Sequence, residues 1–281
     1  MIRPRPLTDL TQLAAQVRGA VVRLAYEGQA AHVASALSCV DVLVASYFGA
    51  LRIDPKNPDD PNRDRFILSK GHAASALYVT LAARGFFPMD ELDRYAQPGT
   101  RLPEQPAPGS VPGVEFATGS LGHGLPVGCG MALAARLAGR DSRVTVLMSD
   151  GECNEGSVWE AAMFASAQRL RRLTVIVDAN GWQATGRTKD ILPLEPLVEK
   201  FRAFGWDAED VDGHDVHNLR RCLEQPRGPR PRAWIARTVK GKGVSFMEDD
   251  NNWHYRVPTA EEVDRAEDEL GGFAYQDGGS R

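Results

Sequence analysis

The chain has 281 residues, 43% of them hydrophobic, and its formal net charge at pH 7 is -4. This length accommodates one large domain or two small ones, and the slightly acidic charge gives no reason to expect nucleic acid or an anionic membrane as a partner. The longest apolar stretch, around residues 126–138, is interrupted by glycine and too short to span a bilayer, and no signal peptide is recognisable. Because the four cysteines form no C-x-x-C pair, we expect reduced thiols in a cytoplasmic protein, without a zinc site.

The first third of the chain predicts helices, polar loops and one short strand. Apolar residues at helical spacing predict helices over residues 8–25 and 38–48, and His32 lies in the loop between them. A Pro-rich connection leads to a short strand over residues 65–68, which ends at Ser69-Lys70-Gly71-His72 before another helix. A polar strand-to-helix turn of this kind points its side chains at the sheet edge where open α/β proteins bind ligands.

Residues 89–116 are rich in proline and glycine and leave little room for regular hydrogen bonding. A loop of this length inside a compact domain is usually either functional or disordered. The Gly-rich segment 118–124 then begins a helix predicted over residues 126–137. It differs from a dinucleotide-binding fingerprint, because no strand precedes it and the glycine spacing is wrong.

The centre of the chain reads as strand, helix, strand. One apolar run, residues 144–148, ends at Ser149-Asp150-Gly151, and a second, residues 173–177, ends at Asp178-Ala179-Asn180-Gly181. Two strands joined by one helix should lie parallel, so both ends face the same edge of the sheet. We therefore expect Asp150 and Asn180 to lie side by side.

This pair of side chains suits a hard divalent cation. One carboxylate and one amide oxygen fit Mg²⁺ or Ca²⁺, whose other positions go to water, a main-chain carbonyl and phosphate. Gly151 permits close approach of a phosphate, and the next helix aims its N-terminus at the same place. An isolated Asp-Gly after a strand is usually only a turn, but the second polar strand end favours a metal-diphosphate site.

The last third predicts two further strands, over residues 205–211 and 233–239, with helices over 196–204 and 216–223. His214 and His217 have the spacing of a metal pair, but an N-cap role for Asp215 explains the segment better. The fold class is therefore α/β, with a mostly parallel central sheet and helices on both faces. We expect one domain over residues 1–258 and a short helix with a flexible tail over 259–281.

The text SDGECNEGSVWEAA followed by VDANGWQATG resembles the thiamine-diphosphate fingerprint. It is similar to the transketolase branch of that superfamily and, more narrowly, to the N-terminal subunit of transketolases split over two polypeptides. The resemblance covers about residues 10–256. It implies the thiamine-diphosphate-binding fold and a cofactor held through Mg²⁺ or Ca²⁺.

Carried over residue by residue, the resemblance implies a role for each of the following residues. The metal ligands would be Asp150, Asn180 and the carbonyl of Trp182. The substrate-facing and catalytic residues would be His32, His72, His254 and Glu155, the last of which links the paired active sites of a dimer. Cofactor contacts would come from His72, Gly119, Leu121, Asp150, Gly151, Glu152, Glu155, Asn180 and His254.

Three positions depart from the family pattern. Alanines 31 and 34 replace the glycines that flank the first histidine, so the loop of His32 is open to another path. Gln105 stands where the family has a histidine in Gly-His-Pro, and glutamine can donate a hydrogen bond but cannot shuttle a proton. His123 stands where glutamine is usual, and its role stays open.

The implied activity is transfer of a two-carbon ketol unit from a ketose or ketose phosphate to an aldehyde. In the family, the glutamate that protonates the aminopyrimidine lies in the next domain. We therefore expect a second, pyrimidine-binding subunit in an α₂β₂ heterotetramer, without which this chain is inactive.

Three other functions stay open. One is another thiamine-diphosphate enzyme, such as the α subunit of a 2-oxo acid dehydrogenase or a deoxyxylulose-phosphate synthase half. The second is a non-catalytic subunit that binds cofactor beside a partner. The third is a metal-dependent phosphate-ester hydrolase.

Overall fold

The computed structural model describes residues 9–107, 109–226 and 228–271. Five parallel strands form one sheet in the order β1-β2-β3-β5-β4. They are β1 (Arg65–Leu68), β2 (Val144–Ser149), β3 (Leu173–Ala179), β4 (Asp207–Asp212) and β5 (Arg232–Arg237). The α/β class is confirmed, and β2 and β3 are parallel neighbours as the strand-helix-strand pattern predicts.

The sheet is buried on both sides, which explains why the central strands read as continuous apolar runs. Successive residues of a strand face opposite sides of the sheet. In β2, Val146 and Met148 join one hydrophobic cluster, while Leu147 between them joins the other. In β3, Ile176 and Val177 divide in the same way.

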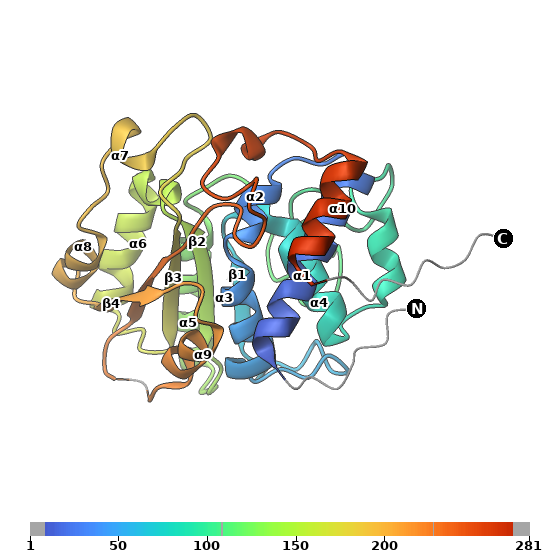
Figure 1. Ribbon diagram of the computed structural model, residues 1–281. Helices are drawn as coiled ribbons and strands as arrows, with labels where there is room; N and C mark the ends of the chain where they lie inside the picture. The colour runs from blue at the N-terminus through green and yellow to red at the C-terminus, as the bar shows by residue number, and fades with distance from the viewer. Residues whose placement is uncertain (1–8, 108, 227, 272–281) are drawn as a thin grey trace.

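Helices cover both faces of the sheet. One face carries α5 (Gly124–Leu137), α6 (Gly156–Ala167) and α8 (Leu197–Ala203). The other face carries α1 (Leu10–Glu27), α2 (Val33–Leu37), α3 (Val40–Ala45), α4 (Ala74–Arg84), α9 (Val216–Glu224) and α10 (Ala260–Glu269). Figure 1 shows α6 and α8 on one side of the sheet and α1, α4 and α10 on the other.

The helix predicted over residues 38–48 is interrupted. Helix α2 ends before Ser38, α3 begins at Val40, and a π-helical turn, Ser46–Ala50, completes the segment. The break has a physical reason, because the Ser38 hydroxyl turns inward and donates to Asp178 at 2.6 Å. Residues 33–50 are long and apolar enough to cross a membrane, but 89% of them are buried inside the protein, as in a core helix.

The Pro- and Gly-rich region 89–116 is packed against the core. A 3-10 turn, Met89–Arg94, begins it, and Leu92, Tyr95 and Leu102 are buried in the cluster around α1 and α4. Four short elements connect the rest: 3-10 turns Gly71–Ala73, Gly151–Asn154 and Asn251–His254, and helix α7 (Thr188–Ile191).

The helix predicted after residue 259 is α10, which Thr259 and Glu262 begin with a capping box. Val263 and Ala266 of α10 are buried in the same cluster as α1. The helix thus packs onto the domain, and the tail predicted beyond it lies outside the described residues.

Candidate cofactor site

Asp150 and Asn180 lie side by side at the carboxyl edge of the sheet. Each follows directly after a strand, and β2 and β3 are paired so that Ser149 lies opposite Asp178. The main-chain nitrogen of Asp150 donates to the carbonyl of Asp178 at 3.1 Å, which joins the two strand ends. The main-chain nitrogen of Gly181, next to Asn180, donates to the Asp150 carboxylate at 2.9 Å.

The Asp150 carboxylate is buried without a cationic partner. It accepts hydrogen bonds from Gly151 N, Gly181 N and the Thr188 hydroxyl, at 2.8, 2.9 and 3.0 Å. No lysine or arginine of the described residues forms an ion pair with it. Burial, followed by the nearby charge of Asp178, raises the pKa of Asp150 to about 6. A divalent cation at this carboxylate would supply the direct counter-charge that no described lysine or arginine provides.

Asn180 and Trp182 offer the remaining oxygens. The Asn180 side-chain oxygen accepts the main-chain N–H of Trp182 at 3.0 Å, and its second lone pair remains for a metal. The Trp182 indole N–H is a donor only and donates to Asp249 at 2.7 Å, so the main-chain carbonyl is the oxygen that Trp182 can offer to a metal. Among the described residues, no three His, Cys, Asp or Glu side chains are grouped to hold a metal. Any ion here would therefore need the amide and a carbonyl besides Asp150, as a magnesium or calcium site does.

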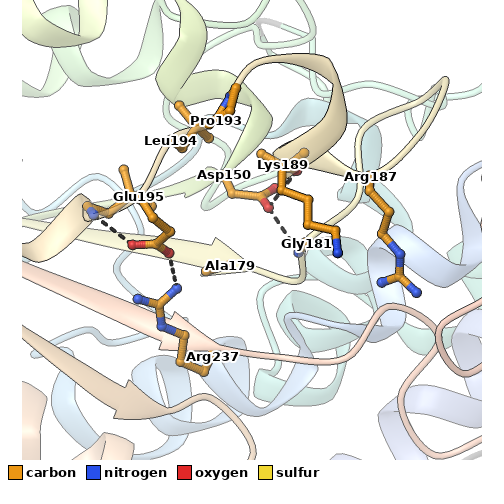
Figure 2. A pocket seen from close by; sticks show the side chains of 11 residues that line it. Asp150, Ala179, Gly181, Arg187, Lys189, Pro193, Leu194, Glu195 and Arg237 are labelled. Carbon is orange, nitrogen blue, oxygen red and sulfur yellow. Dashed lines mark hydrogen bonds and ion pairs between the residues drawn. The ribbon is translucent and has the colours of Figure 1, made fainter.

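A pocket of about 300 Å³ lies beside Asp150. Figure 2 shows Asp150 in its wall, bonded to Gly181, with Lys189 nearby and the Glu195–Arg237 ion pair along the far side. This pocket lies at the carboxyl ends of β2, β3 and β5, and neither Asn180 nor the three predicted histidines line it.

Three histidines predicted from separate motifs come together next to the strand ends. The ring centroids of His32 and His254 are 5.0 Å apart, those of His32 and His72 are 5.6 Å apart, and those of His72 and His254 are 6.1 Å apart. His32 keeps its place although alanines replace the flanking glycines. It has a left-handed backbone, with φ of 70°, and its N–H donates to the carbonyl of His254 at 2.8 Å.

The environment keeps this histidine cluster neutral. Burial, followed by the charge of Lys240, lowers the pKa of His254 from 6.5 to about 3. Burial is also the main cause that lowers the pKa of His32, and burial with the charge of Lys70 places the pKa of His72 well below its usual range. At neutral pH each imidazole can therefore accept one hydrogen bond and donate another.

A buried ion pair lies under the strand ends. Lys70 and Asp178 are fully buried and paired, and Lys70 also donates to the carbonyl of Ser35 at 2.8 Å. Burial opposes the charge on both groups, but the partner outweighs it, so the pKa of Lys70 is raised and that of Asp178 is lowered. Ser38 and Thr238 donate to the same carboxylate, and the Asn180 amide lies 3.4 Å from it.

The Gly-rich segment 118–124 packs against the Ser-Lys-Gly-His turn. A Cβ on Gly71 would lie 2.7 Å from the main-chain nitrogen of Gly119. Gly119 has φ of 142°, and a Cβ there would lie 1.8 Å from the Gln105 side-chain oxygen. Gln105 thus rests directly on the segment whose Gly119 and Leu121 are predicted to contact the cofactor, where it supplies hydrogen-bonding groups but no proton shuttle.

Glu152 is fully buried, and its carboxylate accepts hydrogen bonds from two strand ends and from the Gly-rich segment. The Ser69 hydroxyl and the N–H groups of Gly122 and Ser149 donate to it, the last two at 2.9 and 3.3 Å. The resemblance places Glu152 among the cofactor contacts. In the structure Glu152 holds the ends of β1 and β2 and the Gly-rich segment together, and its contact with the cofactor stays a prediction.

Glu155 and Leu121 lie near this junction. Glu155 is exposed, and its Cβ lies 2.6 Å from where a Cβ on Gly122 would be. His123 is exposed at the start of α5 without a side-chain capping bond. Asp215 caps α9 as predicted, accepting from the Asn218 N–H at 2.8 Å.

The predicted site residues therefore converge, but two of their partners were not predicted. Lys70 stands in the Ser-Lys-Gly-His motif and Asp178 stands two residues before Asn180, yet neither had a predicted role. Their pairing spans 108 residues of sequence. The sequence carries one sign of this pair: a lysine and an aspartate each stand, unusually, at the end of an apolar run that predicts a buried strand.

The family profile described as "Transketolase, thiamine diphosphate binding domain" matches residues 11–277. The chain belongs to the transketolase family. It is 42% identical over 251 residues to the A subunit of the apulose-4-phosphate transketolase of Phocaeicola vulgatus, covering 89% of each chain. It is 44% identical over 219 residues to "6-deoxy-6-sulfo-D-fructose transketolase subunit SqwG" of a Clostridium species, covering 77% of this chain and 80% of that one.

Solved transketolases share the fold. The structure of transketolase from Leishmania mexicana superposes with a TM-score of 0.90 at 26% sequence identity, covering 98% of this chain and 43% of that one. The human transketolase is 37% identical, over 88% of this chain and 40% of its own length. The chain thus corresponds to less than half of a full-length transketolase. It corresponds to most of the length of the relatives that are themselves named as transketolase subunits. Transketolases are transferases.

Proposed function

We propose that this chain is the N-terminal subunit of a two-component transketolase, which transfers a two-carbon ketol unit from a ketose to an aldehyde. One observation carries the proposal: the Asp150–Asn180 pair and the cluster of His32, His72 and His254 meet at one edge of the sheet. Membership of the transketolase family supports this reaction over the other thiamine-diphosphate enzymes and over a phosphate-ester hydrolase.

In this proposal, thiamine diphosphate supplies the nucleophilic carbon and the electron sink of the reaction. Asp150, Asn180 and the carbonyl of Trp182 would hold Mg²⁺, or Ca²⁺, against the diphosphate. The neutral imidazoles would bind substrate hydroxyls and move protons through the ring nitrogens that face the substrate. The names of two relatives refer to sugars with a phosphate and a sulfonate, which supports a ketose with an acidic group as the substrate.

The proposed partner is a C-terminal transketolase subunit that supplies the pyrimidine-binding domain. Two relatives named as the A subunits of their transketolases, matched over 89% and 96% of their length, support a second polypeptide. Glu155 is exposed beside the Gly-rich segment, where a partner chain could reach it. We propose an α₂β₂ assembly in the cytoplasm, where the buried, unpaired cysteines would stay reduced.

Reconstitution tests this function. The purified chain should show no ketol transfer by itself, and activity should need thiamine diphosphate, Mg²⁺ and a C-terminal transketolase subunit from the same source. Products formed from a phosphorylated ketose and an aldehyde would be identified by mass spectrometry. Full activity of the chain without a partner would contradict the two-component assignment, and ketol transfer without thiamine diphosphate would contradict the reaction class.

A further inference from the structure

Lys240 is a buried lysine that the proposed chemistry leaves without a role. It follows β5, and only 1% of its surface is exposed. Among the described residues it forms no ion pair with a carboxylate. Its ammonium instead contacts two neutral acceptors, the Asn251 side-chain oxygen at 2.6 Å and Nδ1 of His254 at 2.9 Å.

The second contact determines the state of the His254 ring. Burial lowers the pKa of Lys240 to about 8, so at neutral pH and below its side chain is charged and has donors but no acceptor. Under these conditions Nδ1 of His254 accepts from Lys240 and carries no proton. The proton of the neutral ring is then on Nε2. His254 is also fixed through its backbone, because its carbonyl accepts the N–H of His32 at 2.8 Å.

We propose that Lys240 is a positioning residue that holds His254 as the neutral tautomer with its proton on Nε2. The ring then offers a hydrogen-bond donor at the nitrogen turned away from Lys240, beside His32 and His72. The charges of Lys70 and Lys240 also oppose protonation of His254, whose pKa burial has already lowered. The consequence for turnover rests on the proposed function, whereas the tautomer is a property of this chain alone.

Asn251 extends the same contact to the metal-binding loop. Its amide N–H donates to the carbonyl of Ala184 at 3.0 Å, shortly after Asn180 and Trp182. Lys240 therefore connects the loop that carries His254 with the loop that carries the proposed metal ligands. Lysine suits this buried position because its long side chain carries several N–H donors, which reach both the Asn251 oxygen and Nδ1 of His254.

Nitrogen-15 spectra of the histidine rings test the tautomer directly. The full chain would be labelled at the histidine rings, and the His254 signal identified by its loss in His254→Asn. In the wild-type chain, His254 should be protonated on Nε2 only and should stay neutral from pH 7 down to about 5, where Lys240 is charged. A wild-type ring protonated on Nδ1 would overturn the proposal without any variant.

Lys240→Met removes the donor and keeps an unbranched side chain. The His254 ring should then populate both neutral tautomers, and its titration should move up toward the ordinary histidine range. Lys242→Met is the matched control, because Lys242 lies in the same loop but pairs with Glu248 at 3.2 Å. An unchanged tautomer in a folded Lys240→Met chain would overturn the proposal.

Activity of the reconstituted complex is a separate measurement. Lys240→Met should lower kcat/KM about 10- to 100-fold, the loss usual when a group that orients a functional histidine is removed, while Lys242→Met should leave it unchanged. If the ring spectra agree but the complex lacks ketol transfer, the proposed function fails and the inference stands. Full activity combined with an altered tautomer would overturn the catalytic consequence of the inference.

Discussion

At the residue scale, the site depends on three imidazoles that burial keeps neutral. His32, His72 and His254 come from three segments of the chain, and each has a pKa below 6.5, the ordinary value for histidine. The unfolded chain binds protons on these rings as the pH falls below about 6.5, whereas the folded chain keeps them neutral to lower pH, so acid should favour unfolding. Asp150 acts in the opposite direction, because its pKa is raised to about 6.

We therefore predict that the free energy of unfolding falls as the pH is lowered from 6.5 toward 4.5, with the histidines outweighing Asp150. His254→Gln should reduce this slope, because one titrating group is removed. Urea unfolding at a series of pH values measures it, with His217→Gln as the control, since His217 lies exposed on α9. An equal slope in His254→Gln and wild type would contradict this account of the cluster.

Which residues form the site was partly predictable from sequence. Asp150, Asn180 and His72 stand at the ends of predicted strands, and parallel pairing brings such ends to one edge. The role of Lys240 was not predictable from sequence, because it depends on how the loop after β5 folds back and brings His254 into contact with Lys240. The left-handed backbone of His32 was likewise invisible, since histidine rarely takes that conformation.

At the element scale, the Lys70–Asp178 ion pair joins the end of β1 to the end of β3. Ser38, at the break between α2 and α3, and Thr238, after the end of β5, both donate hydrogen bonds to the same Asp178 carboxylate. This explains why strands were easier to predict than the helix over residues 38–48. Apolar periodicity marks a buried strand, but it gives no sign of a serine that leaves the helix to bind a distant carboxylate.

Removing one partner of this pair should be strongly destabilising. Lys70→Met should lower the free energy of unfolding by about 3–5 kcal/mol, because Asp178 is left as an unpaired buried charge. The double variant Lys70→Met, Asp178→Asn should lose less than the sum of the two single variants. Lys189→Met, at an exposed lysine, is the control in the same urea measurement. Additive losses would show that the two side chains are not coupled.

At the scale of the whole molecule, a doubly covered parallel sheet presents one edge at which motifs from the full length of the chain meet. The helices α5, α6 and α8 on one face and α1 to α4 on the other bury the sheet, so only its edges remain for a ligand. The turn after β1, the Gly-rich segment before α5, the ends of β2 and β3 and the loop after β5 all contribute. The fold thus acts as a scaffold for the proposed metal-diphosphate site.

Isothermal titration of thiamine diphosphate into the purified chain tests this claim most directly. Binding should need Mg²⁺, should disappear with a chelator, and should be lost in Asp150→Asn but kept in Asp190→Asn, which changes an exposed carboxylate near the same pocket. Binding of equal strength without a divalent cation, or undiminished binding by Asp150→Asn, would contradict the claim that Asp150 and Asn180 hold the ion that anchors the diphosphate.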